Sequence, residues 1–208
     1  HRMQLHKYIL SLKFKKQGDS EKEKELLKEA LNYAIKSRET QEKVLSLKPE
    51  NPLYQRNVAG GKLNEGKLYR ELGDTDSALR LANEALQIQQ IIAAKDANNQ
   101  EIKLDLKESY EDIAFAYLKK SDLNLATASF NKAVELNEQL LAKDPENFDF
   151  WQARLLGEKT WAEALMEIDE KEKAVSVYLK AIRLAETSKN KFKDFNDKFA
   201  NEIKSRLP

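Results

Sequence analysis

The chain contains no cysteine, which excludes disulfides, thiolate metal sites and thiol nucleophiles. Only six glycines and four prolines occur in 208 residues, so tight turns are few and long helices are favoured over many short strands. Lysine plus arginine (36) nearly equals aspartate plus glutamate (35), which gives no electrostatic reason to expect nucleic acid or an anionic membrane as partner. No uninterrupted apolar run approaches the roughly 20 residues that a membrane-spanning helix needs.

Side chains that could carry out chemistry are also few. The only histidines are His1 and His6, and the glycines at Gly60-Gly61 and Gly66 lack the spacing of a phosphate-binding loop. We therefore expect no enzyme activity and no catalytic, cofactor-binding or metal site.

One acidic cluster has two interpretations. Its members are Asp105, Glu108, Glu111 and Asp112. The first interpretation is a site for a divalent cation. The second is a solvated helix face, which the interspersed Lys103 and Lys107 favour because they offset the charge.

Internal repetition is the main signal that the sequence does contain. Three short polar segments start 48 residues apart, at Lys48, Asp96 and Asp144. Small residues keep the same interval: Gly66, Ala114 and Ala162; Ala78, Ala126 and Ala174; Ala85, Ala133 and Ala181. The first unit fits with an offset of 55 instead.

The apolar residues within each unit recur at helical spacing, and Asn51, Asn99 and Asn147 are good helix N-caps. We therefore predict eight helices in four pairs, at 1–16, 20–47, 52–72, 75–95, 99–120, 122–143, 147–167 and 170–187. A coiled coil is the alternative all-helical fold, but turns at fixed intervals interrupt the heptads that it needs.

The order Gly66, Tyr69, Leu72-Gly73-Asp74, Ala78 and Ala85 resembles the tetratricopeptide repeat. The usual period of that repeat is 34 residues, so this chain has 14 more per unit, about two extra turns in each helix. The resemblance, to the long-period bacterial type, implies an all-α, right-handed superhelical array of antiparallel helix pairs. Its four repeats would cover residues 1–48, 49–96, 97–144 and 145–188 of a single domain.

A ninth helix is predicted at 190–206, where Phe192, Phe195, Phe199, Ile203 and Leu207 form an apolar stripe and Lys191, Lys193, Lys198 and Lys204 lie outside it. We expect this helix to cap the open end of the array. The alternative is a segment that binds a partner.

The resemblance also implies a concave groove lined by the first helix of each pair. The groove residues would be Tyr8, Leu12, Leu63, Lys67, Arg70, Glu111, Phe115, Leu118, Lys159, Glu163 and Met166. For Phe115 and Leu118 the alternative is packing into the neighbouring unit. Co-chaperones of this family hold a terminal carboxylate with Lys, Asn and Arg in this groove. Here only Asn64 is present, and Glu108 and Asp112 would repel a carboxylate, so that function is disfavoured.

The second unit departs from the pattern at Glu65, where the other units place Leu10, Ile113 and Trp161 against the core. One interpretation is a loosened helix that admits a ligand near Gly60 and Gly61. The other, which we favour, is that Leu63 and Leu68 take over the packing and leave Glu65 half exposed.

The expected function is that of a scaffold that binds a protein or peptide in the concave groove. The alternative is a ligand- or peptide-sensing domain of a larger bacterial signalling protein, such as a kinase, cyclase or transcription regulator. We expect no nucleic-acid partner and no membrane insertion by this segment. The first residue is His1, so we treat the chain as a soluble, cytoplasmic or extracytoplasmic part of a larger protein, with its oligomeric state open.

Overall fold

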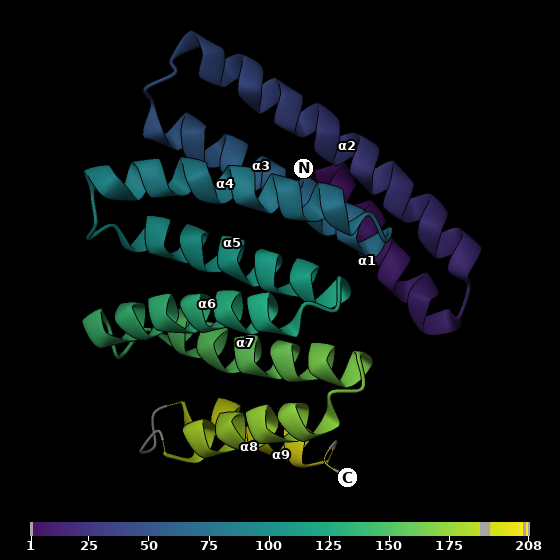
Figure 1. The fold of residues 1–208 in the computed structure, drawn as a ribbon, viewed down its shortest axis with the longest axis vertical. Coiled ribbons are helices and arrows are strands. Elements are labelled where there is room, and N and C mark those ends of the chain that lie inside the picture. The colour runs from purple at the N-terminus through teal and green to yellow at the C-terminus, as the bar shows by residue number, and fades with distance from the viewer. Residues whose placement is uncertain (1, 188–191, 206, 208) are drawn as a thin grey trace.

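The computed structural model describes residues 2–187, 192–205 and 207, and over these ranges every regular element is an α-helix. The helices stack as antiparallel pairs along the long axis of the molecule (Figure 1). Their bounds are α1 Arg2–Gln17, α2 Ser20–Leu47, α3 Pro52–Glu71, α4 Thr75–Lys95, α5 Gln100–Lys119, α6 Leu123–Lys143, α7 Phe148–Glu167, α8 Lys171–Thr187 and α9 Lys193–Lys204. The all-α repeat array is therefore confirmed, and the repeat boundaries stay a prediction.

Each pair consists of a first helix (α1, α3, α5 or α7) and a second helix (α2, α4, α6 or α8), joined by a turn whose backbone enters the left-handed region. The turn residues are Gly18, Gly73, Ser121 and Asp169, with φ of 76°, 90°, 61° and 64°. These positions are 55, 48 and 48 residues apart. They provide a common reference from which equivalent residues of the four units can be counted.

Small residues bring the helices of neighbouring units close together. Ala85, Ala114, Ala126 and Ala181 are at most 1% exposed. At Gly66 a Cβ would lie 3.3 Å from the carbonyl oxygen of Ala78, closer than most side chains tolerate. The intervals between alanines predicted from the sequence therefore mark helix contacts, with the larger apolar side chains packed around them.

The ninth helix caps the array, as predicted. Phe199, Ala200 and Ile203 of α9 are buried against Tyr178 and Ile182 of α8. The helix starts at Lys193 rather than 190 because Phe192, with φ 55°, is in the left-handed region. The predicted residues 190, 191 and 206 lie outside the described residues.

None of the helices in the described ranges combines the length and the apolarity that crossing a bilayer requires.

Helix N-caps give a first prediction. The side chain of Asn99 accepts hydrogen bonds from the backbone N–H groups of Glu101 and Ile102, at 3.1 and 3.2 Å. Replacing Asn99 by Ala should cost about 1 kcal/mol of unfolding free energy, because those donors lose their acceptor. Urea unfolding followed by circular dichroism measures this. The neighbouring Asn98→Ala is the control, since Asn98 precedes the cap; an equal loss in both variants would contradict the prediction.

Candidate functional site

A cleft of about 270 Å³ crosses the first helices of all four pairs. It lies toward their C-terminal ends, so it spans the array rather than one unit. Its lining residues are Lys15, Arg70, Glu71, Phe115, Leu118, Lys119, Thr160, Glu163, Ala164, Glu167 and Ile168. We call it the main cleft. Apolar side chains at its centre and charges of both signs around them can receive an amphipathic segment.

The Phe115 ring at the centre of the main cleft is held on two sides. The Arg70 guanidinium lies 5.2 Å from the ring centroid, and Trp161 packs at 6.1 Å with an interplanar angle of 54°. Arg70 is itself fixed by Asp112, whose Oδ1 accepts from Nη1 at 3.0 Å. The ring is therefore positioned before any partner arrives, which reduces the entropy lost on binding.

Ion pairs connect each first helix with the next along the array. Glu71 of α3 lies 3.5 Å from Lys15 of α1, and Glu167 of α7 lies 2.9 Å from Lys119 of α5. Between α3 and α5, Asp105 accepts two hydrogen bonds from Arg56, at 2.5 and 3.1 Å. Because exposed pairs contribute little individually, their main effect here is to orient the helices that line the cleft.

A second cleft of about 270 Å³ lies between α3 and α5, toward their N-terminal halves. It is lined by Leu53, Arg56, Asn57, Gly60, Leu63, Gln89, Asp105 and Glu108. A Cβ on Gly60 would meet nothing within 4 Å, so this glycine leaves the cleft open.

The acidic cluster on α5 is not the solvated face that the sequence favoured, and that prediction was wrong for Asp112. Asp112 is 7% exposed and pairs with Arg70; its carboxylate also raises the pKa of the Lys67 ammonium, against the opposing effect of burial. Burial raises the pKa of the Glu111 carboxyl, although Lys107 Nζ lies 2.8 Å away and opposes this. These carboxylates are occupied by Lys and Arg, and the described residues contain no cluster suited to a metal ion.

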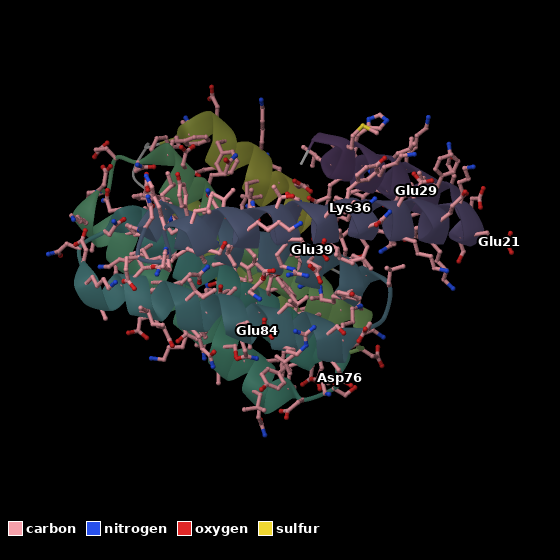
Figure 2. All side chains as sticks on the ribbon, turned by 90° about the horizontal axis from the view of Figure 1, so that it is seen from above. Glu21, Glu29, Lys36, Glu39, Asp76 and Glu84 are labelled. Carbon is pink, nitrogen blue, oxygen red and sulfur yellow. The ribbon has the colours of Figure 1, made fainter. Side chains whose placement is uncertain are left out.

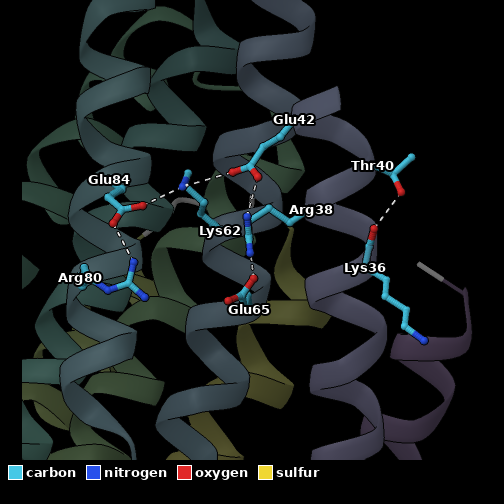
Figure 3. Close-up of polar contacts among 8 residues, drawn as sticks. All are labelled: Lys36, Arg38, Thr40, Glu42, Lys62, Glu65, Arg80 and Glu84. Atoms are coloured by element: carbon cyan, nitrogen blue, oxygen red, sulfur yellow. Dashed lines mark hydrogen bonds and ion pairs between the residues drawn. The ribbon is translucent and has the colours of Figure 1, made fainter. Parts of the chain in front are cut away.

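Glu65 is also not half exposed, as the favoured interpretation expected, but 4% exposed. Arg38 of α2 donates to its Oε2 at 2.6 Å and to Glu42 at 2.7 Å, and Lys62 extends the network to Glu84 (Figure 3). The burial of Leu63 and Leu68, 3% and 2% exposed, agrees with the other half of that interpretation.

The α3 glycines serve packing rather than loosening. α3 is unbroken from Pro52 to Glu71. A Cβ on Gly61 would lie 2.3 Å from Gln41 Oε1 and 3.4 Å from Arg38 Cβ, so glycine lets α2 and α3 approach closely. This removes the observation on which the ligand-admitting helix rested.

Of the groove residues predicted from the sequence, Arg70, Phe115, Leu118 and Glu163 line the main cleft. Leu118 is only 3% exposed, so it forms the floor and packs mainly into the neighbouring unit, and Leu63 is equally buried. Lys159 pairs with Glu202 of α9 at 2.6 Å. Outside the main cleft lie Tyr8, Leu12, Lys67, Glu111, Lys159 and Met166.

Sequence reasoning missed Glu71, Lys119, Thr160, Ala164 and Glu167. Each follows directly after a predicted groove residue: Arg70, Leu118, Lys159, Glu163 and Met166. The lining face is therefore turned by about one residue toward the preceding first helix. Periodicity identifies which helices line the cleft, but the crossing angle between helices decides which residue of each turn faces it.

Comparison with known proteins identifies one repeat directly. Residues 107–140, from the middle of α5 through most of α6, match the family model of the tetratricopeptide repeat. This confirms the resemblance drawn from the sequence, and the match, 34 residues long, does not test the 48-residue interval.

A similar solved structure is a crystal structure of nearly identical TPR-like repeats, assigned to a kinesin light chain of Podosopora anserina. It is 17% identical, with a TM-score of 0.41, and the alignment covers 96% of this chain and 92% of that one. This level of similarity says nothing about a shared partner. No curated protein sequence matches the chain significantly.

Proposed function

We propose that this chain, an all-helical array that contains a tetratricopeptide repeat, is an interaction scaffold that binds a peptide segment of another protein in the main cleft. Repeats of this family generally mediate protein–protein interaction, and stacked helix pairs form concave binding surfaces. The observation that carries the proposal is the pre-positioned Phe115 ring at the centre of a cleft that reaches all four pairs.

The lining of the cleft suggests what kind of peptide it accepts. An apolar side chain would pack on Phe115, Ala164 and Ile168, since these are the apolar groups at the centre. Lys119 and Glu167 lie at the rim and already pair with each other. A partner with charges of both signs can exchange its own groups into such pairs, whereas a strongly charged segment of one sign would leave half of the rim unpaired.

Filling the cleft should abolish this binding. Thr160 is exposed on α7 and lines the main cleft, so Thr160→Arg places a long side chain in it without disturbing the core. Peptides selected from a random phage-displayed library on the unmodified chain should bind this variant at least tenfold more weakly, about 1.4 kcal/mol, by fluorescence anisotropy.

The matched control is Thr127→Arg, since Thr127 is exposed on α6 and lines neither cleft. Its affinity for the same peptides should be unchanged. Selected peptides that bind Thr160→Arg as tightly as the unmodified chain would refute the main cleft as the binding site.

A further inference from the structure

One face of α1 exposes three large apolar side chains in a row. Leu5 is 50% exposed, Ile9 57% and Leu12 38%. Their spacing of four and three residues places them along one side of the helix. We call these three residues the α1 stripe. Figure 2 looks onto this end of the array, where α1 lies beside α2.

The equivalent face of later first helices meets the first helix of the preceding unit. Asp112 stands nine residues before the turn residue Ser121, and it binds Arg70 of α3. Thr160 stands nine before Asp169, and it lines the main cleft with Phe115 of α5. Ile9 stands nine before Gly18. The α1 stripe is therefore the surface that α5 and α7 use against another helix, and here it is uncovered.

The surroundings of the α1 stripe are positively charged. The sequence of α1 contains no Asp or Glu. Lys7 and Lys15 are neutralised by Glu29 and Glu71, at 2.5 and 3.5 Å. Lys13 and Lys16 are exposed and have no ion-pair partner in the part of the chain that the structure describes.

We propose that the α1 stripe binds an amphipathic helix of a partner protein, one whose apolar positions are flanked by Asp or Glu. The apolar row fits the complementary row of another helix, as in the helix-on-helix contacts of the other units. The unpaired Lys13 and Lys16 select acidic flanks, reversing the pairing seen at Arg70 and Asp112.

A helix fits this face better than an anionic membrane does. The stripe shares its geometry with helix-packing faces of the same molecule. The neighbouring α2 also carries acidic residues, among them Glu21 and Glu29 (Figure 2), and these would repel anionic lipid headgroups.

A synthetic helical peptide tests the proposal on the full chain. The probe is a fluorescein-labelled amphipathic peptide with a row of Leu flanked on both sides by Glu; a second peptide has Lys in place of every Glu. We expect the Glu peptide to bind at least tenfold more tightly by fluorescence anisotropy, with an affinity that falls as salt rises. Ile9→Glu should lower that affinity at least tenfold, because it places an acid in the apolar row.

Matched variants separate this site from the main cleft. Leu179→Glu, at a residue 42% exposed on α8, should leave the affinity for the Glu peptide unchanged, and so should Thr160→Arg. Circular dichroism melting of Ile9→Glu checks that the fold is kept. The proposal is overturned if the two peptides bind equally, if Thr160→Arg abolishes binding, or if phosphatidylserine vesicles bind the chain and the Glu peptide does not.

Discussion

Replacing Arg38 by Ala should lower the unfolding free energy by about 3–5 kcal/mol. The variant leaves the carboxylate of Glu65, 4% exposed, without the guanidinium that now lies 2.6 Å from it. Breaking a buried pair by removing one partner is costly because the remaining charge stays desolvated. Urea unfolding followed by circular dichroism measures the loss.

An exposed arginine of the same network is the control. Arg80 is 59% exposed and pairs with Glu84 one helical turn away, at 2.8 Å. Arg80→Ala should cost no more than about 0.5 kcal/mol, since water replaces the lost partner. Similar losses in the two variants would show that burial of Glu65 does not matter.

Removing both charges should restore most of the stability. In the next unit Ile113 occupies the position of Glu65, eight residues before the turn residue. The double variant Arg38→Met with Glu65→Ile should therefore be much closer to the unmodified chain than Arg38→Ala is, because a packed apolar pair avoids the desolvation cost.

Trp161→Ala is expected to cost about 3–5 kcal/mol as well, for a different reason. Trp161 is 3% exposed and stacks on Phe130 at a centroid distance of 4.6 Å. Alanine leaves a large cavity between the third and fourth pairs and removes the support of Phe115. Differential scanning calorimetry of the variant should show a markedly lower melting temperature.

Trp161→Phe is the informative companion of that variant. It keeps an aromatic ring against Phe130 and should lose less than half as much stability. A cost below about 1.5 kcal/mol for Trp161→Ala would mean that the two pairs are coupled weakly at this point. Peptides that occupy the main cleft should also bind Trp161→Ala more weakly, since Phe115 is no longer held.

Helix positions could be predicted from the sequence because their determinants are local. Asn51, Asn99 and Asn147 cap the helices that follow them, and the small residues mark the contacts between pairs. The environment of Glu65 could not be predicted in the same way. Its partner Arg38 lies 27 residues away on α2, in the unit whose spacing differs from the others.

The candidate site was only partly predictable for a related reason. Helical periodicity identified Arg70, Phe115 and Glu163, but the lining face is turned by one residue toward the preceding helix. That rotation depends on how neighbouring helices cross, which arises from packing of the whole array. A buried acid such as Asp112 gives no sign in the sequence that a cation faces it from another helix.

The ion pairs between first helices have a mechanical consequence. Each joins one first helix to its immediate neighbour: Lys15 to Glu71, Arg70 to Asp112, and Lys119 to Glu167. An array connected in this way behaves as a series of elastic joints, and each joint takes up part of any load. Pulling on the two ends would flatten the curvature by small rotations at every joint before any helix unwinds. The width of the main cleft, which spans all three joints, is therefore tied to tension along the chain.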